Sequence, residues 1–417
     1  MKYGTITSDN KRIEIMKSII TKNGNEIKIF AKEIEYQAYD QIKALGEFEA
    51  YANSKIRIMP DCHAGSGCTI GTTMTITDKI TPNLVGVDIG CGMLTVNLGN
   101  IGLSLSKLDE VINKFVPHGF AGHQHQSREI QVKNEVLFNK MKMKPLNKAS
   151  FVGKMTSQTG SLGGGNHFLE LNKGSDGTIY LVVHSGSRNV GNQVAKYYQQ
   201  VAWKSVNEMG TIRDALVEKL KNEGRSSEIA TELKKLQKPK ANKELAYLTG
   251  TDFDDYMNDM NVMQEYAKLN RQSIVDIILK HMGLTVQSSF DTIHNYIDFS
   301  RMILRKGSVS AELGEVFLVP INMRDGSLIC VGKGNPDWNY SAPHGAGRLM
   351  SRTKARNTIE LDTFKEQMKD VYSTSVTDGT LDEAPDAYKS MTDITETIGD
   401  TADIVDTIIP IYNFKSH

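Results

Sequence analysis

Four histidines stand in glycine-rich segments of low charge that lie far apart in the sequence. They are His167 after Gly163-Gly-Gly-Asn, His184 before Ser-Gly-Ser-Arg188, His294 before Asn295, and His344 before Gly-Ala-Gly-Arg348. A fifth segment, Gly86-Val-Asp88-Ile-Gly-Cys91-Gly, adds a carboxylate and a thiol three residues apart. Imidazole, carboxylate and thiolate are the usual ligands of divalent transition metals. Glycine lets the backbone approach a phosphate closely, and Arg or Asn can hold its oxygens. The sequence therefore predicts a metal site merged with a phosphate or nucleotide site.

Two of these motifs have simpler alternatives. Asp88 and Cys91 are ordinarily a turn with a small buried thiol, and they share a metal only if the glycine-rich loop curls. His167 could be a core histidine at a turn, but the three glycines before it cost folding entropy and need a reason, such as close approach to a phosphate. If a helix begins at His167, Glu170 lies on the same helical face.

The other three histidines also allow alternatives. His184 and Arg188 allow two equally good interpretations. They are either a metal ligand with a phosphate-binding arginine or a capped loop with a surface arginine. His294 lies between polar stretches, where a surface histidine is the more common arrangement. Pro343 and the flanking glycines predict a tight turn that presents His344 as a ligand, a general base or a nucleophile. Among the remaining histidines, His63 is the most interesting because it follows Asp61 in a glycine-dense loop.

Two familiar site types are excluded by spacing and number. The segment Gly65-Ser-Gly-Cys-Thr-Ile-Gly lacks both the dinucleotide-binding glycine spacing and the P-loop lysine. Cys62 and Cys68 are too few for a structural zinc site, which needs four ligands close together.

Composition limits the class of protein. The 417 residues carry 49 Lys and Arg against 49 Asp and Glu, so net charge gives no argument for nucleic acid, although it leaves room for a local basic groove. No apolar run approaches the roughly 20 residues of a membrane span, and the N-terminal residues lack the apolar core of a secretory signal. Four cysteines are too few for a disulfide scaffold at this length. We expect a reduced, cytoplasmic setting and no membrane.

Hydrophobic periodicity predicts a mixture of strands and helices without a clear domain boundary. We expect helical patterns over 13–20, 31–51, 108–115, 193–209 and 254–280, and strands over 55–59, 178–184, 315–320 and 327–332. Residues 121–150 give no assignment. Charged residues with Leu at helical spacing over 211–245 predict a solvated helical hairpin inserted in the domain. The apolar tail, 402–414, should pack into the core.

Together these segments resemble the RtcB family of RNA ligases. The matching segments are Met59–Gly71, Val85–Met93, Gly163–Glu170, His184–Arg188, Leu269–Arg271, His294–Tyr296, Arg305–Gly307, His344–Arg348 and Glu383–Lys389. They follow the family order over nearly the whole chain. The resemblance implies an α+β fold with mixed β-sheets flanked by helices, in a single catalytic domain over 1–417 that carries the 211–245 insertion.

The resemblance also implies an activity and a set of site residues. Such enzymes use Mn²⁺ and GTP to join RNA ends bearing a 3′-phosphate or 2′,3′-cyclic phosphate to 5′-hydroxyl ends, in RNA repair or tRNA splicing. A histidine matching His344 carries GMP. Two Mn²⁺ ions are held by residues matching Asp88, Cys91, His167, His184 and His294, with the thiolate bridging. Nucleotide-binding positions match Asn166, Phe168, Glu170, Asn295, Ala346, Gly347, Tyr388 and Lys415. Positions that contact RNA or phosphate match Asp61, Arg188 and Arg348.

Some residues depart from the common family pattern. Asn322 replaces a serine in the segment Val319–Arg324, Tyr340-Ser-Ala-Pro precedes His344 where Cys and Ser are usual, and Ile293 replaces a frequent second histidine. The departures resemble a branch associated with RNA repair, sometimes beside a release-factor-like partner; we expect a monomer. Two other functions use the same residues. One is a metal-dependent 2′,3′-cyclic phosphoesterase that does not seal, and the other is a non-catalytic RNA-end sensor.

Overall fold

The computed structural model describes residues 6–7, 12–14, 18–207, 209–235 and 242–416. Its largest sheet is antiparallel, in the order β11-β8-β10-β9-β18-β16-β15. Its strands are β8 (Gly92–Gly99), β9 (Phe168–Lys173), β10 (Ile179–Ser185), β11 (Ser288–Ile293), β15 (Val316–Asn322), β16 (Gly326–Gly332) and β18 (Ala402–Lys415). The C-terminal segment is therefore a central strand, as its apolar character predicts.

A second sheet is mixed and has the order β12-β13-β7-β6-β4-β3. Its strands are β3 (Ser18–Ile20), β4 (Glu26–Ile29), β6 (Ile56–His63), β7 (Ile70–Thr75), β12 (Asn295–Asp298) and β13 (Ile303–Lys306), and β4 and β6 pair in parallel. Short strands β1 (Ile6–Thr7), β2 (Arg12–Glu14) and β5 (Glu33–Glu35) form a small sheet. Two more, β14 (Ser308–Ser310) and β17 (Ser341–Pro343), pair just before His344.

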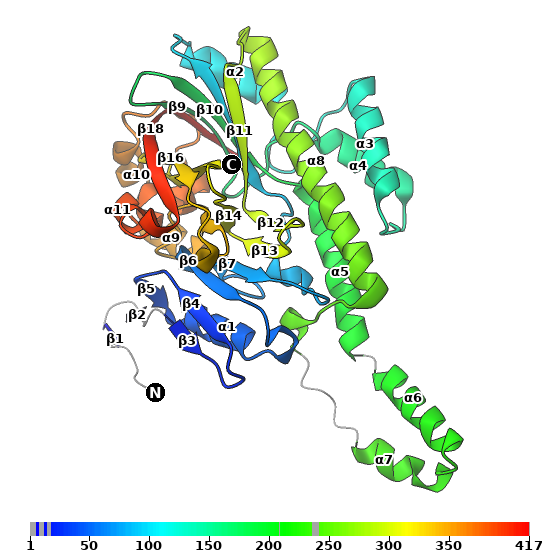
Figure 1. The fold of residues 1–417 in the computed structure, drawn as a ribbon. Helices are drawn as coiled ribbons and strands as arrows, with labels where there is room; N and C mark the ends of the chain where they lie inside the picture. Colours follow the sequence, from blue (N-terminus) through cyan, green and yellow to red (C-terminus); the bar gives the residue numbers. More distant parts are fainter. Residues whose placement is uncertain (1–5, 8–11, 15–17, 208, 236–241, 417) are drawn as a thin grey trace.

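Helices flank these sheets. They are α1 (Tyr36–Gly46), α2 (Leu105–Phe115), α3 (Arg128–Lys140), α4 (Lys148–Gln158), α5 (Arg188–Asn207), α6 (Met209–Asn222), α7 (Ile229–Lys235), α8 (Gly250–Met282), α9 (Arg352–Thr358), α10 (Leu361–Gln367) and α11 (Met391–Thr395). Helix α8 runs along one side of the molecule, and α6 and α7 extend away from it (Figure 1). The structure confirms the predicted α+β class. No helix within the described ranges is long and apolar enough to cross a membrane.

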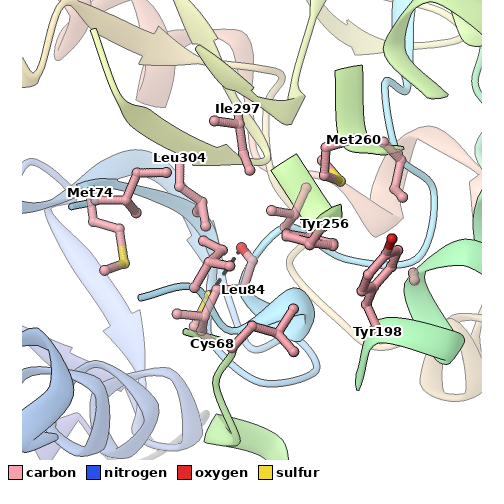
Figure 2. Packing of buried hydrophobic residues seen from close by; sticks show 14 of the residues in the cluster. Cys68, Met74, Leu84, Tyr198, Tyr256, Met260, Ile297 and Leu304 are labelled. Atoms are coloured by element: carbon pink, nitrogen blue, oxygen red, sulfur yellow. Dashed lines mark hydrogen bonds between the residues drawn. The ribbon is translucent and has the colours of Figure 1, made fainter. Parts of the chain in front are cut away.

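Two apolar cores meet along α8. One joins the second sheet to α5 and α8, and Figure 2 shows Met74, Leu304, Tyr198 and Tyr256 among its side chains. Cys68 is buried there among apolar groups, where a thiol acts as a small hydrophobic residue. The other core packs the large sheet against α2 and α8. Cores of this kind hold α8 rigidly, because truncating a buried leucine or isoleucine costs about 2–5 kcal/mol.

Most predicted elements are present, with one error and one omission. The helical pattern over 13–20 is wrong, because β2 covers residues 12–14, β3 covers residues 18–20 and pairs with β4, and residues 15–17 lie outside the described ranges. The unassigned residues 121–150 contain α3 and the start of α4, whose N-caps Ser127 and Asn147 accept hydrogen bonds from backbone N–H groups of the first turn. Helices α6 and α7 lie in the segment 211–245, but residues 236–241 fall outside the described ranges. Its assignment as an insertion within one catalytic domain stays a prediction.

Candidate metal and nucleotide site

The predicted metal ligands gather at one edge of the large sheet because of strand pairing. Cys91 immediately precedes β8, His167 precedes β9, His184 is near the end of β10, and His294 follows β11. In the antiparallel register, His184 faces Met93 at the start of β8 and Phe168 at the start of β9. Ile293 faces Gly92, so the end of β11 reaches the same edge. Four segments distant in sequence therefore deliver their side chains to one place.

Helix α8 holds these segments from behind. The guanidinium of Arg271, fully buried, donates to the backbone oxygens of Gly90 and Ser185 at 2.7 and 3.0 Å and pairs with Asp291 at 2.7 Å. Asn270 beside it donates to Gly186 at 3.1 Å. One turn of α8 thus ties the loop before β8, the end of β10 and strand β11 together.

The candidate ligand cluster consists of Asp88, Cys91, His167, His184 and His294. Its atoms form a continuous chain of contacts. Asp88 Oδ2 lies 2.8 Å from His167 Nε2, Cys91 Sγ lies 3.3 Å from both His167 Nε2 and His184 Nε2, and His184 Nε2 lies 3.0 Å from His294 Nε2. Two groups with metal-ligand spacing, Asp88-Cys91-His167 and Cys91-His184-His294, share the thiol. The cluster therefore has the arrangement that a bridging thiolate between two ions requires.

The surroundings of His184 and His294 favour their neutral imidazole form. Burial, with the neighbouring histidines, lowers the pKa values of His184 and His294 well below the usual range, so their ring nitrogens keep lone pairs at neutral pH. Burial and the Asp88 carboxylate raise the pKa of the Cys91 thiol well above its usual range. Burial works against ionisation of Asp88, but His167, Cys91 and Arg188 together outweigh it, and the pKa of Asp88 is lowered.

The cluster fits a divalent transition-metal cation. Tetrahedral ligands at about 2.0–2.3 Å from a metal lie about 3.5 Å from one another, close to the contacts found here. His167 Nδ1 and His294 Nδ1 are buried with no hydrogen-bond partner in the described part of the chain. An imidazole, carboxylate and thiol set of this kind takes Mn²⁺, Fe²⁺, Co²⁺ or Zn²⁺.

His294 and His167 show why single motifs were ambiguous. The expectation of a surface histidine at 294 is wrong, because the residue is only 3% exposed. No helix begins at His167; strand β9 follows it, so Glu170 is a strand residue. The glycine run also has a packing reason, because a Cβ on Gly163 would lie 1.9 Å from His167 Nδ1.

His344 lies beside the cluster and is oriented by Asp61. Its ring centroid is 4.8 Å from that of His294. Fully buried Asp61, near the end of β6, accepts hydrogen bonds through Oδ2 from His344 Nδ1 at 2.6 Å and from the His344 backbone N–H at 3.1 Å. Gly347, at φ +77°, lets the turn after His344 pack on β6, because a Cβ there would lie 2.2 Å from the Asp61 carbonyl oxygen. With Nδ1 committed to the carboxylate, Nε2 of His344 is the nitrogen left for chemistry.

A cavity of about 240 Å³, the first cavity, opens in front of His344. All eight predicted nucleotide-binding residues line it: Asn166, Phe168, Glu170, Asn295, Ala346, Gly347, Tyr388 and Lys415. His184, His294 and Arg348 line it as well. Burial raises the pKa of Glu170 to about 7, although Asn413 and Asn172 donate to its carboxylate at 2.6 and 3.3 Å.

Sequence reasoning missed the carboxylate that organises the wall of the first cavity. Buried Glu383 accepts from Tyr388 Oη at 2.6 Å and pairs with Lys415 at 2.8 Å, Arg352 at 3.2 Å and Arg348 at 3.4 Å. These cations outweigh its burial and keep its pKa below the usual range. The segment Glu383–Lys389 is one of the segments that match the family, so the sequence pointed to Glu383 without indicating what its carboxylate does.

Lys389 is a second missed residue. Its buried Nζ donates to the backbone oxygens of Pro60 and Cys62 at 3.0 and 3.4 Å, on either side of Asp61. It therefore fixes the segment of β6 that orients His344.

A second cavity of about 640 Å³ lies on the other side of the cluster. Asp88, His167 and Arg188 line it. The Arg188 guanidinium donates to Ser161 Oγ at 3.1 Å and to the Gly119 carbonyl at 2.5 Å. No ion pair joins it to a carboxylate among the residues that the structure describes. The predicted phosphate residues are thus divided, with Arg348 facing the first cavity and Arg188 the second.

The residues that depart from the family pattern make contacts with their near neighbours. Asn322 lines the first cavity, but its side chain closes the β15–β16 turn by donating to Asp325 and accepting from the backbone N–H groups of Arg324 and Asp325. The Tyr340 ring lies under the Arg301 guanidinium, 3.7 Å from centroid to carbon.

Comparison with known proteins identifies the class to which this fold and cluster belong. Residues 41–416 match the family model described as tRNA-splicing ligase RtcB. An RNA-splicing ligase RtcB1 of Escherichia coli is 27% identical over 430 residues, which cover 94% of this chain and 97% of the relative. The RNA-splicing ligase RtcB of Escherichia coli K12 is 26% identical with the same coverage. A tRNA-splicing ligase RtcB of Aeropyrum pernix is 26% identical over 80% of this chain and 82% of its own. The chain belongs to the RtcB family.

Proposed function

We propose that this protein is a GTP- and Mn²⁺-dependent RNA ligase. It joins RNA ends bearing a 3′-phosphate or 2′,3′-cyclic phosphate to 5′-hydroxyl ends through a guanylylated His344. The observation that carries the proposal is the hydrogen bond of 2.6 Å between His344 Nδ1 and Asp61, which leaves Nε2 free at a cavity that His184 and His294 of the ligand cluster also line. The relatives named RNA- or tRNA-splicing ligases support it.

The proposed reaction makes and breaks bonds in three steps. Asp61 holds the proton on His344 Nδ1, so the Nε2 lone pair attacks the α-phosphorus of GTP; a P–N bond forms and pyrophosphate leaves. An oxygen of the RNA 3′-phosphate then takes the GMP group, and the P–N bond breaks. The 5′-hydroxyl oxygen finally attacks the 3′-phosphorus, GMP leaves, and the hydroxyl proton passes to a base. A cyclic end first needs one hydrolysis to a 3′-phosphate.

The ligand cluster would hold two cations. Asp88, Cys91 and His167 would hold one, and Cys91, His184 and His294 the other, with the thiolate shared. Bound Mn²⁺ supplies positive charge against the triphosphate and lowers the pKa of coordinated oxygen nucleophiles. Arg348 on the first cavity and Arg188 on the second add fixed positive charge for phosphate oxygens.

The nucleotide would lie in the first cavity. Glu170 and Asn166 offer polar groups, Phe168 and Tyr388 offer aromatic surface, and Lys415 lies 2.8 Å from Glu383, which fixes its position. The Asn295 Oδ1 accepts from the Gly307 N–H at 2.9 Å and fixes the loop that follows β13.

The test is labelling with [α-³²P]GTP and Mn²⁺, followed by mapping of the modified residue. We expect an acid-labile label on the wild type that is lost in His344→Ala. His281→Ala is the matched control, because His281 stacks on Phe115 away from both cavities. A metal-loaded wild type that takes no label would refute the proposal. Loss of a cyclic phosphate without GTP or joining would instead indicate the phosphoesterase, and RNA binding without turnover would indicate the end sensor.

The biological setting is a further part of the proposal. The relatives' names point to RNA or tRNA splicing, and the departures at Asn322 and Tyr340 favour a role in RNA repair. A release-factor-like partner, a monomeric state and a cytoplasmic location stay predictions. Joining assays with cleaved tRNA, with and without a cell extract, would test the need for a partner.

A further inference from the structure

An exposed aromatic side chain lies at the wall of the second cavity and has no role in the chemistry above. Phe120 is 104% exposed, although a phenylalanine ordinarily buries its ring. It lines the same cavity as Asp88, His167 and Arg188. A solvent-exposed ring costs hydrophobic free energy, and its position beside the ligand cluster calls for a binding role.

The loop that carries Phe120 is held on both sides. The Pro117 carbonyl accepts from the Leu162 N–H at 2.8 Å, and the His123 N–H donates to the Ser157 carbonyl at 2.7 Å. The Gly119 carbonyl accepts from Arg188 at 2.5 Å. The backbone is thus fixed immediately before the ring, which is what a stacking surface needs in order to bind without a large ordering cost.

The rest of the wall carries groups that can bind a single-stranded nucleic acid. Arg188 supplies a cation, and Asn189 and Asn192 supply amides. Arg356 also lines the cavity but pairs with Asp382 at 3.1 Å, and the carboxylates of Asp88, Asp382 and Glu383 lie on the same wall. The buried Asn192 Oδ1 has no hydrogen-bond partner within the described ranges. Cations beside an exposed aromatic are the usual combination for binding a sugar-phosphate backbone and a splayed base.

A protein partner fits this surface less well. Of the large apolar side chains that are exposed in the described part of the chain, Phe120 and Val87 are the ones that line the cavity. Two isolated apolar groups among charges do not make the apolar centre of a protein interface.

We propose that Phe120 is the stacking platform for the terminal base of the RNA end that carries the 3′-phosphate. Arg188 links the phosphate-binding and base-stacking parts of this subsite. Its guanidinium lines the cavity and also donates to the Gly119 carbonyl, which immediately precedes Phe120. Of the two RNA ends, the 3′ end is the one with a terminal phosphate for the Arg188 guanidinium, whose hydrogen bonds within the described residues go to Ser161 and Gly119. The inference rests on the proposed function and adds how the RNA substrate is held.

The test uses a single-stranded RNA with a 3′-phosphate and 2-aminopurine as its terminal base. Stacking on Phe120 should quench its fluorescence when it binds the metal-loaded protein. Phe120→Ala should abolish most of the quenching and weaken binding roughly 5- to 100-fold, the usual range for one base–aromatic stack. Phe120→Trp should restore both.

Three controls make the result specific. Leu146→Ala removes another fully exposed apolar side chain, which does not line the cavity, and should bind RNA as the wild type does. An abasic 3′-terminal nucleotide should weaken wild-type binding as much as Phe120→Ala does, with no further loss when the two are combined. GTP labelling of Phe120→Ala should be unchanged, because that step needs no RNA.

The inference is overturned if Phe120→Ala binds and quenches like Leu146→Ala, if the abasic loss adds to the loss in Phe120→Ala, or if labelling falls together with RNA binding. If the wild type takes no GTP label but the quenching and its dependence on Phe120 remain, the ligase proposal fails while the stacking subsite stands.

Discussion

Replacing Asp61 by asparagine tests the role given to His344 most directly. The carboxylate accepts from His344 Nδ1 at 2.6 Å and from its backbone N–H at 3.1 Å, inside a fully buried site. Asparagine keeps the shape and removes the charge. If its oxygen faces the ring, the Nδ1 proton stays and only a charge-assisted hydrogen bond weakens, by about 1.5–3 kcal/mol or roughly 10- to 150-fold in rate. If its NH₂ faces the ring, Nδ1 must accept, the proton moves to Nε2, and the nucleophile is lost.

The second geometry sets the upper limit of the effect. The corresponding change in serine proteases lowers kcat about 10⁴-fold because the imidazole adopts the wrong tautomer. We therefore expect the single-turnover rate of GTP labelling in Asp61→Asn to fall between about 10- and 10⁴-fold. Metal content should be unchanged, because Asp61 is not in the ligand cluster. Asp337→Asn is the matched control, since Asp337 pairs with Lys28 and Arg57 outside both cavities. A labelling rate for Asp61→Asn within twofold of the wild type would refute the orientation argument.

Three other perturbations test the remaining parts of the site. Cys91→Ser should remove both Mn²⁺ ions while His294→Ala removes one, because the thiol belongs to both ligand groups and His294 to one. Mass spectrometry measures the number of bound ions, and two ions retained by Cys91→Ser would contradict the shared ligand. Glu170→Gln should flatten the pH dependence of stability. Burial raises the pKa of Glu170 to about 7 from 4.5, so its contribution to the free energy of unfolding is full below about pH 4.5 and is lost as pH rises through 7. Relative to the wild type, the free energy of unfolding of the variant should therefore be about 3 kcal/mol higher at pH 8 than at pH 4.5. Parallel thermal-unfolding profiles of the two proteins at pH 5 and 8 would contradict this. Arg271→Met should destabilise the protein by about 3–5 kcal/mol, because it leaves Asp291, whose side chain is only 15% exposed, without its cation. Urea unfolding measures this, and a loss below 1 kcal/mol would show that α8 does not hold the strand ends.

The sequence predicted elements whose signal is local. β10 follows a run of β-branched residues and the long helix α8 follows a pattern with few breakers, so each was expected close to its observed bounds. The stretch 13–20 was misassigned because short strands in it are specified by pairing with β4 and β5, which no local pattern records. The polar segment that forms α3 was missed because its helix depends on packing against α8 and α4 more than on an apolar stripe.

The candidate site divides in the same way. Residue types and glycine-rich context were enough to single out the five candidate ligands and His344 as a set. The burial of His294 could not be predicted, because it results from the pairing of β11 with β8 and from the backbone bond between the His294 N–H and the Cys91 carbonyl. The roles of Glu383 and Lys389 were also hidden, since each acts on residues more than thirty positions away along the chain, Lys415 and Asp61 respectively among them.

The position of the ligand cluster gives a physical reason why one site could serve two substrates. His184 and His294 face the first cavity, Asp88 and His167 face the second, and Cys91 is buried between them. A nucleotide in the first cavity and an RNA end in the second would therefore approach the same charges from opposite sides. Under the proposed function, the guanylyl group would form on His344 in the first cavity before RNA arrives, and would then pass to an RNA end held beside Arg188 in the second. This arrangement predicts that single-turnover GTP labelling proceeds at the same rate with and without a bound RNA end that lacks the 3′-phosphate and so cannot accept GMP.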